Sequence, residues 1–184
     1  MTLRTRFFAA MYDRQIARSE KAGLRAFREA LLAGAAGDVL EIGSGTGGNL
    51  PCYGPAVTSL TMTEPQLPML RRLQHKASRH TQDVTILRAP AEDLPFDNGS
   101  FDVAVSTLVL CGVDDWLNRL VVCCDCNRPT LDSIRDAGFT PGQVEHTTLP
   151  KAPKFASPTI MGAATTPSPA PAHPSPLASG TSPD

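Results

Sequence analysis

Residues 39–47 decide the fold of this chain, and they read VLEIGSGTG. The apolar residues at the start of this stretch are typical of a buried β-strand, which we expect to span Asp38 to Ile42. The glycines that follow let the backbone turn sharply and let a ligand approach it closely. Dinucleotide-binding sites and ordinary tight turns share such a glycine-rich turn, so the turn alone does not establish a function.

Short apolar runs recur after this stretch at the spacing of an alternating α/β chain. We expect strands at Val57–Met62, Val84–Leu87 and Phe101–Val105. The clearest helix between them is predicted at Pro68–Ser78, and Asn98–Gly99 predicts a tight turn before the last strand. Strands that alternate with helices form a parallel sheet. The predicted fold is therefore α/β, a doubly wound and mainly parallel sheet with helices on both faces.

The N-terminal region has the pattern of an amphipathic helix. Apolar residues such as Leu24, Phe27 and Leu31 recur every three or four positions between Leu3 and Leu32, and Gly23 is expected to weaken or divide the helix.

The C-terminal part is predicted to hold a short helix and two closing strands. The helix is expected at Pro129–Ala137 and ends at Gly138, which we expect to be left-handed. Val144–Leu149 and Thr159–Ala163 are predicted to be antiparallel strands. Residues 165–184 are nearly all Pro, Ala, Ser, Thr and Gly, which predicts a disordered tail and limits the folded domain to residues 1–164.

The composition of the chain limits which partners, cellular location and metal sites we expect. The formal charge is −1 and the 17 Lys and Arg residues are spread along the sequence, so we expect no nucleic-acid partner. No apolar run is long enough to cross a bilayer and no signal peptide is evident, so we expect a cytoplasmic protein without a membrane partner. The five cysteines, three of them close together, fit a reducing compartment, and no metal site is expected because a second pair of ligands is missing.

Two acids give the glycine-rich turn a chemical meaning. Glu41 precedes the turn, and a carboxylate there would repel an anionic pyrophosphate but attract a ligand that carries a sulfonium and an ammonium group. Glu64 lies 17 residues beyond Gly47, close to the spacing at which doubly wound folds place an acid on ribose hydroxyls. The pair therefore favours S-adenosylmethionine over a dinucleotide.

The sequence resembles the small class I S-adenosylmethionine-dependent methyltransferases of type 11, which include relatives of the ubiquinone and menaquinone C-methyltransferases. The resemblance covers residues 38–115 and rests on three blocks in order: Val39–Gly47, Leu60–Pro65 and Ala89–Val105. It implies S-adenosyl-L-methionine as cofactor, a lid formed by residues 1–33, and methyl transfer to a small-molecule acceptor.

The resemblance also implies which residues bind the cofactor. By this resemblance, the methionine end would be held by Glu41, Gly43, Ser44, Gly45 and Gly47; the ribose by Glu64 beside Pro65; the adenine edge by Ala91 and Glu92; and Ser106 and Thr107 would lie near the methyl donor. This chain departs from the family at Pro90, where the family usually has Asp. Because proline has no N–H, adenine contacts must come from neighbouring groups.

A second departure follows Asp115, where the family has a helix and a fifth strand introduced by an "L-R-P-G-G" turn. No such turn exists here, so we infer an internal deletion and a sheet shortened near strand five, with Leu120–Cys124 as a substitute strand. Two alternatives to an active methyltransferase stay open: a remnant that binds the cofactor without catalysis, and a nucleotide-dependent oxidoreductase. No catalytic residue, acceptor or oligomeric state is predicted.

Overall fold

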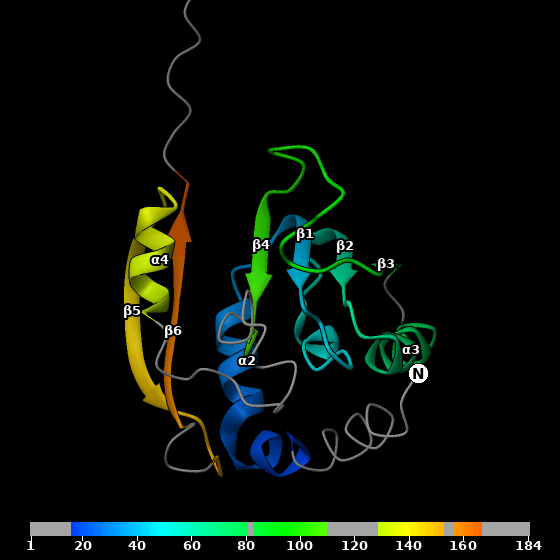
Figure 1. Ribbon diagram of the computed structural model, residues 1–184. Helices are drawn as coiled ribbons and strands as arrows, with labels where there is room; N and C mark the ends of the chain where they lie inside the picture. Colours follow the sequence, from blue (N-terminus) through cyan, green and yellow to red (C-terminus); the bar gives the residue numbers. More distant parts are fainter. Residues whose placement is uncertain (1–15, 81–82, 110–128, 153–156, 167–184) are drawn as a thin grey trace, which may run out of the picture.

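The computed structural model describes residues 16–80, 83–109, 129–152 and 157–166 (Figure 1). The elements in chain order are η1 (Glu20–Leu24), α2 (Arg25–Leu32), β1 (Gly37–Ile42), η2 (Leu50–Cys52), β2 (Val57–Thr63), α3 (Leu67–Ala77), β3 (Val84–Leu87), β4 (Val103–Ser106), α4 (Thr130–Asp136), β5 (Thr140–Thr148) and β6 (Pro158–Thr165). None of the helices in these ranges is long and apolar enough to span a membrane.

A four-stranded parallel sheet with strand order β3-β2-β1-β4 organises the molecule. This confirms the predicted parallel α/β fold. The start of β4 differs from the expectation, because the strand begins at Val103 and not at Phe101. The Phe101 ring instead packs edge-to-face on Phe96, with centroids 5.0 Å apart, which closes the loop that contains the left-handed Gly99.

The hydrophobic core lies on one face of this sheet. Val39 of β1 is aligned with Leu60 of β2, and both are almost completely buried. Because side chains alternate along a strand, Met62 lies on the same face as Leu60. Leu32 of α2 and Leu73 of α3 join the same core cluster, so both helices cover this face. Glu41 also points to this face, since it lies two residues after Val39.

The helical region before β1 differs from the predicted apolar stripe. Gly23 has φ +129°, so the chain bends there as expected. The buried positions beyond the bend are Leu24, Arg28 and Leu32, whereas Phe27 and Leu31 are only half-buried. Leu24 is thus buried as predicted, but beyond it the buried face is shifted by one residue from Phe27 and Leu31 to Arg28 and Leu32. Residues 1–15 of the expected lid lie outside the described residues.

The C-terminal strands pair with each other and form their own sheet. β5 and β6 are antiparallel, as predicted, and α4 precedes them and ends at Gly138 with φ +88°. They form a separate two-stranded sheet and do not close the parallel one. In Figure 1 this hairpin lies on the β4 side of the parallel sheet. The expected strand Leu120–Cys124 and residues 167–184 of the expected tail lie outside the described residues.

Candidate functional site

The glycine-rich loop after β1 has a backbone conformation that favours glycine at three positions. Gly43, Gly45 and Gly47 have φ values of +67°, +56° and +78°. A Cβ on Gly43 would lie 2.6 Å from Cγ1 of Val109, and one on Gly47 would lie 2.9 Å from Cδ1 of Leu73. Glycine is therefore required at two of the predicted positions by both backbone conformation and space.

Glu64 joins this loop to the end of β2. Its Oε2 accepts a hydrogen bond from the N–H of Gly45 at 2.9 Å, and its Oε1 accepts one from the N–H of Gln66 at 2.8 Å. The side chain is only 5% exposed, and burial raises its pKa, while the two amides oppose that shift. A carboxylate has about four lone-pair sites, so two more donors can bind here. The structure thus brings Glu64 and Gly45 together, as the predicted site requires.

The backbone also ties together the strand ends around Glu64. The N–H of Ser44 donates to the carbonyl oxygen of Thr63 at 2.8 Å, and the N–H of Glu64 donates to that of Leu87 at 3.1 Å. The carboxyl ends of β1, β2 and β3 therefore meet at one edge of the sheet. In doubly wound folds this edge is where ligands bind.

Glu41 is more deeply buried than a residue that meets solvent at a strand end. It is 2% exposed, and its Oε2 accepts a 2.6 Å hydrogen bond from the hydroxyl of Tyr53. Burial raises the pKa of Glu41 from 4.5 to about 7, although Tyr53, Arg28, Asn49 and Ser44 all favour the ionised form. The site thus holds one carboxylate that can change its charge near neutral pH.

The two residues predicted near the methyl donor, Ser106 at the end of β4 and Thr107 directly after it, lie in different surroundings. Ser106 pairs with Ile42 at the end of β4, and its Oγ is the only buried side-chain N or O atom without a hydrogen-bond partner in the described residues. The Thr107 hydroxyl accepts hydrogen bonds from Asn49 at 2.9 Å and from Arg28 at 3.1 Å. A buried hydroxyl without a partner is expected where a ligand completes the site.

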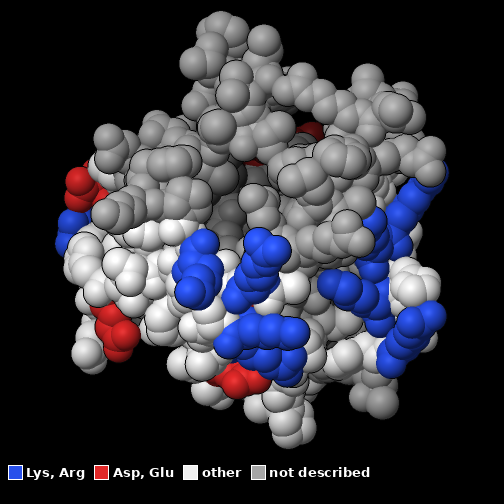
Figure 2. Space-filling model, turned by 90° about the horizontal axis from the view of Figure 1, so that it is seen from below, with Lys and Arg blue, Asp and Glu red and all other residues white. Residues whose placement is uncertain are grey.

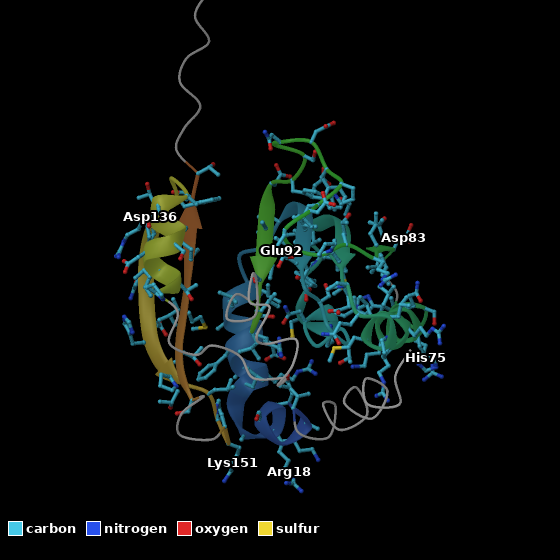
Figure 3. All side chains as sticks on the ribbon, in the orientation of Figure 1. Arg18, His75, Asp83, Glu92, Asp136 and Lys151 are labelled. Carbon is cyan, nitrogen blue, oxygen red and sulfur yellow. The ribbon has the colours of Figure 1, made fainter. Side chains whose placement is uncertain are left out.

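The predicted adenine-binding block follows β3. Nε of Arg88 donates to the carbonyl oxygen of Pro65 at 3.0 Å, which brings the chain after β3 beside the chain after β2. Ala91 is half-buried and Glu92, labelled in Figure 3, is exposed. The role of these two residues at the adenine edge stays a prediction.

Sequence reasoning missed three residues that contact the predicted ones: Tyr53, which holds Glu41, and Arg28 and Asn49, which hold Thr107. The spacing of Leu24 and Leu32 in the N-terminal helix did indicate that Arg28 is buried. A charged residue at the centre of the repeat Leu24, Arg28, Leu32 lies on the buried face of the helix.

The described surface of the molecule on the side toward which the parallel strands point carries several Lys and Arg side chains (Figure 2). β1, β2 and β4 point downward in Figure 1, and Arg18 and Lys151 lie at that lower end in Figure 3. Figure 2 shows this face from below, and its described Lys and Arg residues are more numerous than its Asp and Glu residues. Such a face favours the approach of anionic molecules.

Comparison with known proteins gives consistent matches. A family model described as a methyltransferase domain matches residues 40–130. The ubiquinone/menaquinone biosynthesis C-methyltransferase UbiE of Geobacter sp. (strain M21) is 31% identical over 118 residues, which cover 55% of this chain and 50% of that enzyme. Human thiol S-methyltransferase TMT1B is 41% identical over 88 residues, or 45% of this chain and 35% of that enzyme. The chain thus spans half or less of these two relatives.

A solved structure shows the same fold over most of the chain. The 1,6-didemethyltoxoflavin-N1-methyltransferase of Burkholderia thailandensis, solved with its substrate and S-adenosylhomocysteine, has a TM-score of 0.61 and 20% identity. The match covers 90% of this chain and 88% of that enzyme. The parallel sheet and the acid joined to a glycine-rich loop agree with this match, and residues 40–130 belong to the methyltransferase-domain family, whose class I S-adenosylmethionine-dependent members share this fold.

Proposed function

We propose that the chain binds S-adenosyl-L-methionine at the carboxyl ends of β1, β2 and β4 and transfers its methyl group to a small-molecule acceptor. The observation that carries this proposal is the hydrogen bond between Glu64 and the amide of Gly45, which joins the acid expected on the ribose to the loop expected around the methionine. The relatives named above, which are methyltransferases with small-molecule acceptors where their names state one, support the reaction class.

The residues present fit this cofactor chemically. Glu64 has lone pairs left for both ribose hydroxyls. Ser106 offers a buried hydroxyl without a partner in the described residues, and Glu41 offers negative charge near a sulfonium and an ammonium group. When bound, S-adenosylmethionine supplies an activated methyl group. The work of the protein would be to align the acceptor with that group and to exclude water.

We propose only the chemical class of the methyl acceptor. One relative is named a thiol S-methyltransferase and another a C-methyltransferase of ubiquinone and menaquinone biosynthesis. We propose that the acceptor is a small molecule, with no nucleic-acid and no membrane partner, and we assign no catalytic residue.

Isothermal titration with S-adenosylhomocysteine tests the cofactor, and NAD serves as the competing ligand. We expect saturable binding of S-adenosylhomocysteine and none of NAD. Tight binding of NAD without binding of S-adenosylhomocysteine would favour a nucleotide-dependent oxidoreductase over a methyltransferase. A methyl-transfer assay with a panel of thiols, phenols and amines then tests the reaction.

A second candidate is a chain that binds the cofactor without catalysis. The observation that favours it is the parallel sheet, which ends at β4 in the described residues and does not continue into the β5–β6 hairpin. Saturable binding together with no transfer to any acceptor of the panel would support this candidate.

A further inference from the structure

Arg28 is a buried cation that the proposed function has not yet used. It lies on the core-facing side of α2 and is 7% exposed. Burying a guanidinium is costly unless its N–H groups and its charge are satisfied. Its surroundings therefore indicate which groups the fold needs it to hold.

Its partners come from three different segments. Nη1 donates to Oδ1 of Asn49 at 2.7 Å and to Oγ1 of Thr107 at 3.1 Å, and Nε donates to Oε1 of Glu20 at 2.9 Å. Asn49 belongs to the loop after β1, and Thr107 directly follows β4. The guanidinium also lies against the loop backbone, because a Cβ on Gly48 would be 3.3 Å from its Cζ. One side chain thus connects two of the loops expected to surround the methyl donor.

These contacts determine what the Thr107 hydroxyl can do. Its oxygen accepts from Arg28 at 3.1 Å and from Nδ2 of Asn49 at 2.9 Å. A hydroxyl has two acceptor lone pairs and one proton, so with both lone pairs engaged it can offer a further group only its proton. Arg28 and Asn49 therefore hold Thr107 as a hydrogen-bond donor.

Arg28 also acts on Glu41. The groups that face Glu41 are the Tyr53 hydroxyl, the Arg28 guanidinium, and the side chains of Asn49 and Ser44. Arg28 is the only charged group among them, and its positive charge lowers the pKa of Glu41 against the effect of burial. Loss of that charge would leave Glu41 neutral over a wider range of pH.

We propose that Arg28 is a positioning residue of the methyl-donor site: it holds the loop after β1 against the end of β4 through Asn49 and Thr107. The inference rests on the proposed function and adds to it a residue of the helix that precedes the sheet.

The first experiment compares S-adenosylhomocysteine binding by calorimetry in the full chain and in the variants Arg28→Gln and Arg28→Lys. Arg25→Gln is the matched control, because Arg25 lies on the same helix but is exposed and pairs with Glu29 at the surface. We expect Arg28→Gln to weaken binding by about tenfold, as for loss of a hydrogen bond to a charged group, and Arg25→Gln to change it by less than about twofold. Arg28→Lys keeps the charge and should recover part of the affinity.

The second experiment distinguishes positioning from a merely structural role. The carboxyl carbon of Glu41, observed by NMR without ligand, should titrate at a higher pH in Arg28→Gln than in the wild-type chain or in Arg25→Gln. A structural loss alone would reduce affinity and leave this titration in place. Either an unchanged titration of Glu41 or an unchanged affinity in Arg28→Gln would overturn the inference.

The remaining outcomes separate this inference from the proposed function. If the wild-type chain binds S-adenosylhomocysteine and Arg28→Gln binds it equally well, only the role of Arg28 is wrong. If the wild-type chain does not bind it, both are wrong. Should Arg28→Gln fail to fold, Thr107→Val takes its place, because this variant removes the accepting oxygen without changing α2. It should lose affinity where Thr107→Ser retains it, and unchanged affinity in Thr107→Val would refute the role assigned to Arg28.

Discussion

Two carboxylates of the site lie at neighbouring strand ends but have different surroundings. Glu64 accepts from two backbone amides, which are fixed donors that favour the ionised form. Glu41 depends on a tyrosine hydroxyl and on more distant groups, and it lies deeper in the core. Fixed backbone donors therefore oppose the effect of burial at Glu64, whereas Glu41, with a pKa of about 7, can change its charge near neutral pH.

Replacement of Glu64 tests the joined loops directly. Glu64→Ala leaves the amides of Gly45 and Gln66 without their acceptor and removes the expected ribose contact, so we expect cofactor binding to weaken by about 1–3 kcal/mol. Calorimetry with S-adenosylhomocysteine measures the change. Asp38→Ala is the control, because Asp38 is an exposed acid near the opposite end of β1. Equal affinity in all three chains would remove Glu64 from the site.

Glu41 should make stability depend on pH in an unusual direction. Its pKa is about 7 in the folded chain and 4.5 ordinarily, so the folded state binds more protons than the unfolded state between these values. Stability should therefore fall as pH rises from 4.5 to 7 and stay level above, by about 3 kcal/mol at most. Urea unfolding at several pH values, compared with Glu41→Gln, measures this contribution. If the difference between the two chains does not vary with pH, the assignment fails.

At the scale of elements, α3 supports the glycine-rich loop. Leu73 is completely buried, and its Cδ1 lies within 2.9 Å of where a Cβ on Gly47 would be. Its neighbour Lys76 also reaches the loop, with Nζ 3.5 Å from Oγ1 of Thr46. The helix that covers the core therefore also holds the loop that carries the site.

Truncation of Leu73 should disturb both roles. Leu73→Ala is expected to lower the free energy of unfolding by about 2–5 kcal/mol, because it leaves a cavity between α3 and the sheet. S-adenosylhomocysteine binding should weaken as well, since Gly47 loses its packing partner. Gln74→Ala, an exposed position on the same helix, is the control. Full stability in Leu73→Ala by urea unfolding would contradict this packing.

The elements that sequence could predict are those whose signals are local. The apolar run of β3 is bounded by polar residues and was predicted with its observed limits, Val84–Leu87. The spacing between Glu64 and the glycines correctly predicted that Glu64 lies beside the glycine-rich loop, because the lengths of the strands and turns between them are narrowly limited. Arg28 was missed because its burial depends on Asn49 and Thr107, which lie 21 and 79 residues away in the sequence. A local pattern cannot show such distant partners.

At the scale of the whole molecule, the two sheets differ in how well they are covered. Strands β1 and β2 contribute several fully buried side chains to the core, whereas β5, β6 and α4 contribute none. The sequence predicted the strands of the hairpin but not their separation from the parallel sheet, because alternation within a strand does not identify its neighbour. We therefore expect the parallel sheet to resist local unfolding better than the β5–β6 hairpin.

Hydrogen exchange should show this difference. We expect the amides of β1 and β2 to exchange only through global unfolding, and those of β5 and β6 to exchange faster through local opening, because few buried contacts hold the hairpin. A matched pair of variants gives an independent measurement. Met62→Ala, at a fully buried position of β2, should lower the free energy of unfolding by about 2–5 kcal/mol, and Met161→Ala, at a half-buried position of β6, by less than about 1 kcal/mol. Equal protection of both sheets, or equal losses in the two variants, would mean that the hairpin and the parallel sheet unfold as one cooperative unit.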